Sequence, residues 1–199
     1  MNLKQSFTVI PALAVLLMFS ACTRTVRQQL PPIRVALLPM ENQTTNMDGP
    51  RLVREKFYRR MLEKYGYITQ PLDETDVILR EMGITDAGQL NAFKPQDVGA
   101  KLGVDAMIYG NLIIFKPVRV ALGDVMRVNY RMIEAGTGET MWQFEDGITA
   151  LSKIDFNDSV AENLQNLFKR AAVEKIVRIP LDEETYRITL RAVRNMPRR

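Results

Sequence analysis

Few residues in this chain could carry out chemistry, and their types limit what the protein can do. The 199 residues include no histidine, the side chain that most often serves as a general base or metal ligand near neutral pH. Catalytic triads that depend on histidine are therefore excluded. The one cysteine, Cys22, offers no partner for an intramolecular disulfide and no thiolate set for zinc. We therefore predict a protein that is not an enzyme and that holds no metal and no cofactor.

Two acidic clusters are the remaining candidates for metal binding or acid and base chemistry. They are Asp73, Glu74 and Asp76, and then Asp182, Glu183 and Glu184. Both stand at expected helix starts, where a carboxylate complements the helix dipole and stabilises the helix by about 0.3 to 1 kcal/mol. We favour this structural role, and an enzyme that uses carboxylates stays as an alternative. The sequence Gly136-Thr137-Gly138 lacks a complete phosphate-loop motif and predicts a hairpin turn.

A polar loop follows the first expected strand and is the candidate site for a ligand or partner. It contains Asn42, Gln43, Thr44 and Thr45. Open α/β sheets commonly bind ligands beyond the carboxyl ends of their strands, which is where this loop lies. The alternative is that these side chains only form turns by bonding their own backbone.

The beginning of the chain has the pattern of an export signal that ends at a lipid attachment site. Residues 7–21 carry no charge and include Pro11, and this run is shorter than the roughly 20 apolar residues of a membrane-spanning helix. Phe19-Ser20-Ala21-Cys22 resembles the lipobox of bacterial lipoproteins, with Phe19 in place of the usual leucine. We predict a signal peptide over residues 1–21 and acylation, including palmitate, at Cys22. Thr23 in place of aspartate favours the outer membrane, facing the periplasm.

Beyond Cys22 we expect a lipidated tether over residues 22–32, one domain over 33–179 and a basic C-terminal tail over 180–199. The tail contains Arg187, Arg191, Arg194, Arg198 and Arg199. Clustered arginines can neutralise nucleic-acid phosphates, but an exported protein seldom meets DNA, so we expect no nucleic-acid partner. Contact with an anionic envelope polymer or lipid head group is an alternative to a simple solvated face.

The first half of the domain alternates strands and helices. We expect strands over residues 33–40, 67–70 and 104–115, and helices that begin near Asp48, over 73–81, and from Pro95 to Gly103. The first helix should bury a stripe of Val53, Phe57, Met61, Leu62 and Tyr65, and Gly66 should take a left-handed conformation after it. Asp73 or Thr75 could cap the second helix.

The second half predicts an antiparallel hairpin followed by helices. Met126, Val128, Tyr130 and Met132 alternate with polar residues over 124–133, and residues 140–144 return with Trp142 and Phe144 on one face. Asn157 or Asp158 should cap a long helix. Its stripe would be Val160, Leu164, Leu167, Phe168 and Ala171. After Pro180 the pattern suits a helix or a strand, and we favour a helix. Together these elements predict an α/β fold, a mixed sheet sandwiched by helices.

Three stretches carry a family resemblance. They are VALLPMEN from Val35, LGVDAMIYG from Leu102, and GTGETMW from Gly136. With the lipobox, they resemble a family of uncharacterised bacterial lipoproteins that is similar to the curli secretion lipoprotein CsgG, the polysaccharide secretion lipoprotein PelC and the penicillin-binding-protein activator LpoB. Met40 departs from the phenylalanine usual there. The resemblance implies a fold like the N-terminal domain of TolB and no catalytic residues.

The resemblance also orders the functional hypotheses. The first is a structural or accessory lipoprotein of an envelope secretion or assembly system, with an envelope protein partner and homo-oligomers as in the secretion relatives. The second is a regulatory module that binds a peptidoglycan synthase. Residues 116–123 between two strands are too few for the membrane hairpins of CsgG, so we expect no pore built by this chain.

Overall fold

The computed structural model describes residues 30–116, 124–149, 165 and 181–199. The expected signal peptide, Cys22, most of the tether, residues 117–123 and the helix expected from Asn157 or Asp158 lie outside the described residues. The chain divides into two units, Met1–Leu30 and Pro31–Arg199. The architecture below is that of the second unit.

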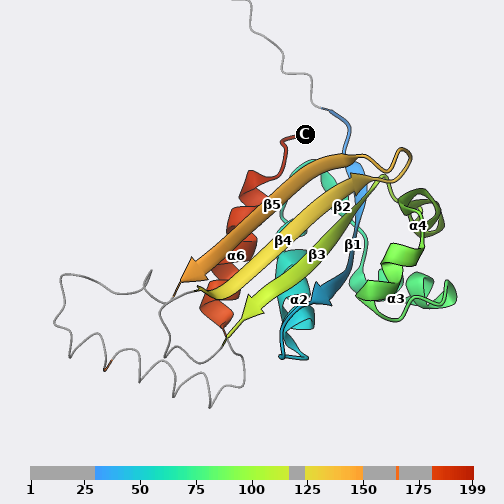
Figure 1. Cartoon of the computed structure of the whole chain (residues 1–199). Coiled ribbons are helices and arrows are strands. Elements are labelled where there is room, and N and C mark those ends of the chain that lie inside the picture. The colour runs from blue at the N-terminus through green and yellow to red at the C-terminus, as the bar shows by residue number, and fades with distance from the viewer. Residues whose placement is uncertain (1–29, 117–123, 150–164, 166–180) are drawn as a thin grey trace, which may run out of the picture. The chain divides into compact units, whose positions relative to one another are not determined.

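A mixed sheet of five strands forms the centre of this unit, in the order β2, β1, β3, β4, β5 (Figure 1). β1 (Ile33–Asn42) lies parallel to both β2 (Tyr67–Thr69) and β3 (Ala106–Phe115). β4 (Asp124–Glu134) runs antiparallel to β3 and to β5 (Thr140–Thr149). The expected mixed sheet and its antiparallel hairpin are confirmed.

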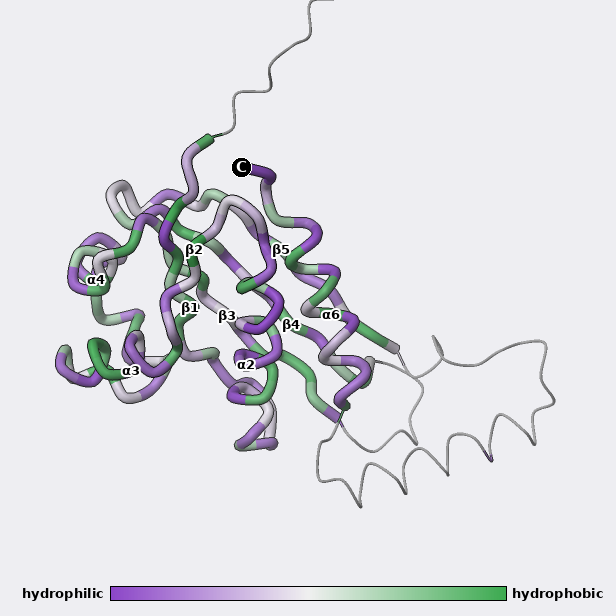
Figure 2. Tube along the Cα trace, turned by 180° about the vertical axis from the view of Figure 1, so that it is seen from behind, coloured by the Kyte–Doolittle hydropathy of each residue, from purple (hydrophilic) through white to green (hydrophobic). Residues whose placement is uncertain are grey.

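Helices cover both faces of the sheet, as the figures show from opposite sides (Figures 1 and 2). On one face α2 (Gly49–Met61) and α6 (Asp182–Asn195) pack over a large apolar cluster. The other face bears α3 (Leu72–Glu81), the 3-10 helix η2 (Ala87–Ala92) and α4 (Pro95–Leu102) over a smaller cluster. The predicted α/β class, with a sheet between helices, is confirmed.

The burial of β1 and β4 explains why their sequence patterns differ. In β1, Val35 and Leu37 join the cluster under α2 and α6, whereas Ala36 and Leu38 join the one under α3 and α4. A strand covered on both faces reads as a continuous apolar run. β4 buries alternate residues from Met126 to Met132. Its polar residues face the side that α3 and α4 leave open, so alternation was the right prediction there.

The first two helices correct details of the prediction. α2 has Pro50 in its first turn, as expected, but it ends at Met61. The predicted stripe positions Leu62 and Tyr65 are 58% and 69% exposed, because the chain turns there toward β2 through the left-handed Gly66 (φ 82°). α3 has Pro71 at its N-cap and no side-chain cap, so the predicted caps, which lie inside the helix, were wrong.

Residues 181–199 are part of the compact unit that ends at Arg199, so the stretch predicted as a basic tail packs as α6. Leu181, Ile188, Ala192, Val193 and Met196 are buried in the larger cluster. Trp142 Nε1 donates to Asn195 Oδ1 at 3.0 Å and joins β5 to the end of α6. The helix alternative is therefore the correct one, because residues three and four apart share the buried face. None of the helices in the described part of the chain is long and apolar enough to cross a membrane.

Candidate functional site

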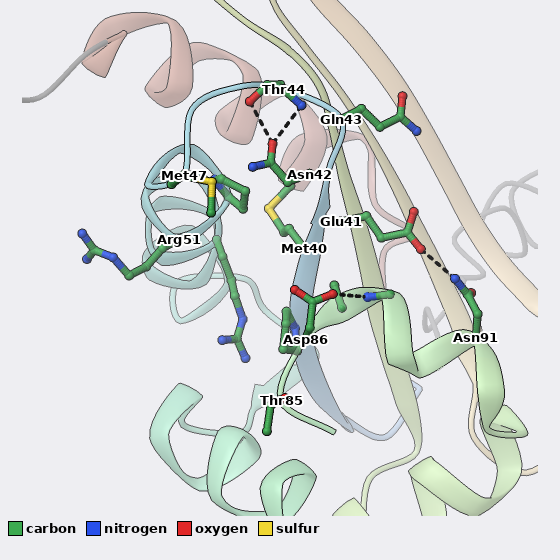
Figure 3. A pocket seen from close by; sticks show the side chains of 15 residues that line it. Met40, Glu41, Asn42, Gln43, Thr44, Met47, Arg51, Thr85, Asp86 and Asn91 are labelled. Carbon is green, nitrogen blue, oxygen red and sulfur yellow. Dashed lines mark hydrogen bonds between the residues drawn. The ribbon is translucent and has the colours of Figure 1, made fainter. Parts of the chain in front are cut away.

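An open cleft of about 840 Å³ lies at the carboxyl end of β1 (Figure 3). Three segments line it: the end of β1 with its following loop, the first turns of α2, and residues 85–88 with Asn91 of η2. The chain leaves β1 through α2 on one face of the sheet and returns to β3 through α3, η2 and α4 on the other. Such a reversal of strand order leaves a crevice at the strand ends, which is the usual ligand position in open α/β sheets.

The predicted loop residues meet this cleft, but two of them are committed to the loop itself. Asn42, Gln43 and Thr44 line the cleft, whereas the exposed Thr45 does not. Asn42 Oδ1 accepts from the Thr44 hydroxyl at 2.8 Å and from the Thr44 N–H at 3.0 Å. The Asn42 amide also donates to the Asn46 carbonyl at 3.0 Å. Both side chains therefore form turns, as the alternative interpretation expected.

A register shift in β1 shapes the floor of the cleft. Leu37 pairs with Ile108 and Met40 with Gly110, so one extra residue of β1 is accommodated beside Pro39. Proline has no N–H to donate to a ladder and favours such a bulge. Met40 then packs over Gly110, where a Cβ would stand only 2.8 Å from Met40 Cγ. The absence of a side chain at Gly110 leaves room for the Met40 side chain.

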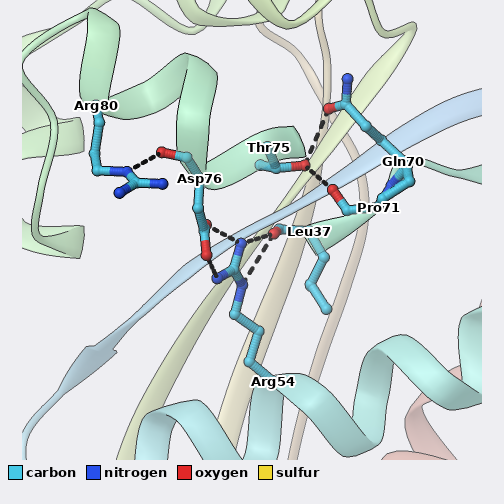
Figure 4. Close-up of polar contacts among 7 residues, drawn as sticks. All are labelled: Leu37, Arg54, Gln70, Pro71, Thr75, Asp76 and Arg80. Carbon is cyan, nitrogen blue, oxygen red and sulfur yellow. Dashed lines mark hydrogen bonds and ion pairs between the residues drawn. The ribbon is translucent and has the colours of Figure 1, made fainter. Parts of the chain in front are cut away.

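Arg54 lines the inner wall of the cleft (Figure 4). Its side chain hydrogen-bonds the edge of β1 beyond the point where β2 ends. The Val35 carbonyl accepts from the Gln70 N–H at 2.9 Å, at the point where β2 ends. Two residues further along β1, the Leu37 carbonyl points to the same side and accepts from Arg54 Nη2 at 2.7 Å and Nε at 3.1 Å. Arg54 also forms a two-pronged ion pair with Asp76 of α3, at 2.9 and 2.7 Å. This pair couples helices on opposite faces of the sheet.

Two carboxylates in the cleft hold its outer wall in place. Asp86 accepts from the Gly88 N–H at 2.8 Å, and the Gln89 side chain accepts from the Asp86 N–H at 3.0 Å, which together make a capping box. Glu41 Oε1 accepts from the Asn91 amide at 3.0 Å. These carboxylates bind backbone and amide groups, so the geometry supports a contact surface better than a pair of acid and base.

The cleft continues into a smaller polar groove of about 260 Å³ over β3, β4 and β5. Glu41 and Asn91 line both hollows. Tyr109 lies in this groove with the Arg131 guanidinium 5.6 Å from its ring centroid. Burial raises the pKa of Tyr109, and the charge of Arg131 offsets part of this rise. The cleft and the groove together offer a ligand or partner amide groups, one aromatic ring and charges of both signs.

The two acidic clusters have structural roles. Asp73 and Glu74 lie in the first turn of α3, and Asp182, Glu183 and Glu184 lie in the first turn of α6. Their positions match the helix-dipole interpretation. Asp76 pairs with Arg54. Within the residues that the structure describes, no three acidic, histidine or cysteine side chains come together as a metal site.

Sequence analysis located the cleft but missed most of its walls. Arg51, Arg54, Asp86 and Asn91 were not among the candidates. One signal was available for the η2 wall, since aspartate followed by glutamine three residues later is typical of a capping box. Arg54 gave no such signal, because its partners Leu37 and Asp76 are 17 and 22 residues away.

A comparison with protein-family models finds a match over residues 25–197 to the family described as "Putative lipoprotein GNA1162-like". The chain belongs to this GNA1162-like family. The match covers most of the predicted tether, the whole sheet and α6, so it includes most of the stretch predicted as a tail. A search of curated protein sequences finds no match.

Solved structures similar to this GNA1162-like protein include the following three. The lipoprotein GNA1162 from Neisseria meningitidis is 20% identical, with a TM-score of 0.52 over 73% of this chain and 97% of that one. A PelC dodecamer variant from Paraburkholderia phytofirmans is 9% identical, with a TM-score of 0.47 over 83% and 89%. The LpoB C-terminal domain from Salmonella enterica is 11% identical, with a TM-score of 0.45 over 69% and 93%. At these identities the likeness to GNA1162 concerns the fold.

Proposed function

We propose that this GNA1162-like protein is a non-enzymatic lipoprotein, anchored in the outer membrane by acyl chains on Cys22 and facing the periplasm. There it acts as a structural or accessory component of an envelope secretion or assembly system. The observation that carries the proposal is the family match over residues 25–197. The lipobox that ends at Cys22 gives independent support from the sequence.

The geometry of the cleft supports contact as the mode of action. Its carboxylates Glu41 and Asp86 hold η2 and its loop, and Arg54 holds the edge of β1. A wall whose polar groups fix one another keeps its shape, which lowers the entropic cost when a partner binds. Met47, 86% exposed at the rim, gives that partner an apolar contact.

A photocrosslinking amino acid in place of Met47 tests this proposal in intact cells. Val77, 47% exposed on α3 and not among the cleft-lining residues, is the matched control position. We expect the Met47 probe to capture one component of an envelope secretion or assembly system, and the Val77 probe to miss it. Identical products from both positions would remove the cleft as the contact site. Capture of a peptidoglycan synthase would favour the regulatory alternative.

Self-association is a second part of the proposal, and it rests on the secretion lipoproteins that the sequence resembles. Native mass spectrometry of the acylated protein in detergent tests it directly. We expect a defined multiple of the single-chain mass. A single-chain mass at every concentration would remove oligomerisation and leave the proposed anchoring intact.

A further inference from the structure

One corner of the domain combines basic side chains with exposed apolar ones. We call it the anchor corner. It consists of Leu62, Lys64, Tyr65, Ile68, Arg194, Arg198 and Arg199. Leu62, Tyr65 and Ile68 are 58%, 69% and 53% exposed, and exposed apolar side chains that gather in one patch can mark a contact with a partner or a membrane. Their neighbours on the turn after α2 and at the end of α6 supply the positive charge.

Contacts between distant parts of the chain hold this corner together. The Lys64 ammonium donates to the carbonyls of Val193 at 2.9 Å and Met196 at 3.4 Å, so it caps the C-terminus of α6. The Tyr67 hydroxyl donates to the Pro197 carbonyl at 2.9 Å. Arg199 packs on Gly66, where a Cβ would lie 2.7 Å from Arg199 Cβ. The final residues are therefore fixed beside the turn that precedes β2.

The positive charges at this corner are close enough to affect one another. Burial lowers the pKa of Lys64, and the nearby positive charge of Arg198 lowers it further. Two acidic residues lie near the corner. Glu63 pairs with Arg60 at 3.5 Å, and Asp105 accepts from the Arg34 N–H at 2.7 Å. The four basic side chains of the anchor corner outnumber these two carboxylates, which leaves an excess of positive charge for an external anion.

The tether enters the domain at this same corner. The Ile33 N–H donates to the Gly66 carbonyl at 3.1 Å, and the figures show the start of β1 and the C-terminus at one end of the sheet (Figures 1 and 2). Ten residues lie between Cys22 and Ile33, and the eleven steps from one to the other reach at most about 40 Å. A lipid on Cys22 therefore holds this corner within about 40 Å of the bilayer, and the cleft lies at the opposite end of β1.

We infer that the anchor corner docks on the surface of an anionic phospholipid bilayer. Tyrosine and aliphatic side chains next to arginine suit the boundary between head groups and acyl chains. Anionic head groups complement the charge of Arg194, Arg198 and Arg199. The inference rests on the proposed lipid anchor, and it adds an orientation in which the cleft points away from the membrane.

The test uses the mature acylated protein in vesicles and two labelled variants. Acylation consumes the one native cysteine, so Tyr65→Cys and the control Met47→Cys each carry a single free thiol for a fluorophore. The vesicles contain either phosphatidylglycerol with phosphatidylethanolamine or phosphatidylcholine alone, with some lipids spin-labelled near the head group. Flotation measures anchoring, and quenching by the spin-labelled lipids measures docking.

We expect both variants to float with both vesicles, and strong quenching only for the Tyr65 label on anionic vesicles. Arg194→Gln with Arg198→Gln should lower the ratio of docked to undocked protein about 30-fold, since each arginine near an anionic surface contributes about 1 kcal/mol. Arg80→Gln with Arg187→Gln removes the same charge elsewhere and should leave quenching unchanged. Circular dichroism of each variant verifies its fold.

Three results would overturn the inference. In the first, the protein floats but the Tyr65 label is quenched no more than the Met47 label. This result would contradict docking and would leave the proposed anchoring intact. Protein that does not float would remove both. A Tyr65 label that ignores lipid but changes its emission when dextran sulfate is added would assign the corner to an anionic polymer instead.

Discussion

The guanidinium of Arg54 binds the carbonyl of Leu37 from the side where β2 has already ended, through Nη2 at 2.7 Å and Nε at 3.1 Å. A side chain of α2 thus takes the place of a strand at the edge of β1. The same guanidinium forms an ion pair with Asp76 of α3. One buried residue in the wall of the cleft therefore connects the sheet with the helices on both of its faces.

Replacing Arg54 should therefore destabilise the whole domain. We expect Arg54→Ala to lower the free energy of unfolding by about 2 to 3 kcal/mol, because a buried carbonyl loses its donor and Asp76 its partner. Arg54→Lys should recover only part of this loss, since an ammonium cannot match the fork geometry. Arg51→Ala, one turn earlier with exposed partners, should cost less than about 1 kcal/mol. Urea unfolding of the three variants measures the difference, and equal losses for Arg51→Ala and Arg54→Ala would contradict this role.

The close approach of α4 to the end of β4 depends on Gly99. A Cβ there would lie 2.4 Å from Ala135 Cβ and 3.1 Å from Ala135 Cα. We expect Gly99→Ala to lower the melting temperature, because overpacking by about 1 to 3 kcal/mol outweighs the gain of about 1 kcal/mol in helix propensity. Gly136→Ala, which meets open space, is the control and should leave the melting temperature nearly unchanged. Stabilisation by Gly99→Ala would show that the helix can move away.

Tyr130 should make the domain sensitive to alkaline pH. It is fully buried against Phe57, with ring centroids 4.4 Å apart, and burial raises its pKa well above the usual value. Below pH 10 both folded and unfolded chains keep this phenol protonated, so stability is retained. Above about pH 10 only the unfolded chain releases the proton, which lowers stability by as much as about 1.4 kcal/mol per pH unit.

Tyr130→Phe should remove this dependence at little cost. Within the residues that the structure describes, the Tyr130 hydroxyl has no hydrogen-bond partner, so its loss near pH 7 should be neutral or slightly stabilising. Tyr109→Phe is a matched control, because the partly exposed Tyr109 should contribute a weaker dependence. Urea unfolding between pH 8 and pH 11 measures both slopes. An unchanged slope in Tyr130→Phe would refute the assignment.

The sole tryptophan reports whether α6 belongs to the core. Trp142 binds Asn195 of α6, and Ile188 is fully buried on the same helix. We expect Ile188→Ala to lower the free energy of unfolding by about 2 to 5 kcal/mol and to shift tryptophan emission to the red. The half-buried Leu190 gives a control, since Leu190→Ala should cost less. Wild-type stability of Ile188→Ala would indicate that residues 181–199 behave as the predicted tail.

Local patterns predicted most of the fold, while long-range pairings decided what was missed. Alternation from Met126 to Met132 identified the buried face of β4, and Pro95 with Gly103 marked the bounds of α4 to within one residue. The end of α2 was misplaced because Leu62 and Tyr65 fit a helical stripe, and only packing shows that no layer covers them. η2 was missed because six residues are too few for a periodic pattern.

The same difference between local sequence patterns and long-range pairings applies to the candidate site. Chain order alone placed Asn42 and Thr44 at the end of the first strand, where the cleft opens. The functional inference from their polarity was weaker, since both side chains satisfy their own loop. Arg54 and Asp86 became wall residues only when the crossover brought α2 and η2 to the same strand end, which no short sequence window contains.

The most direct test of this account is the intact mass of the peptide that contains Cys22, isolated from membranes of cells that express the full chain. We expect a new N-terminus at Cys22 that carries a diacylglyceryl group on sulfur and a third acyl chain on nitrogen, and loss of membrane retention in Cys22→Ser. An unmodified Cys22 still joined to residues 1–21, in protein that is exported and soluble, would contradict the account.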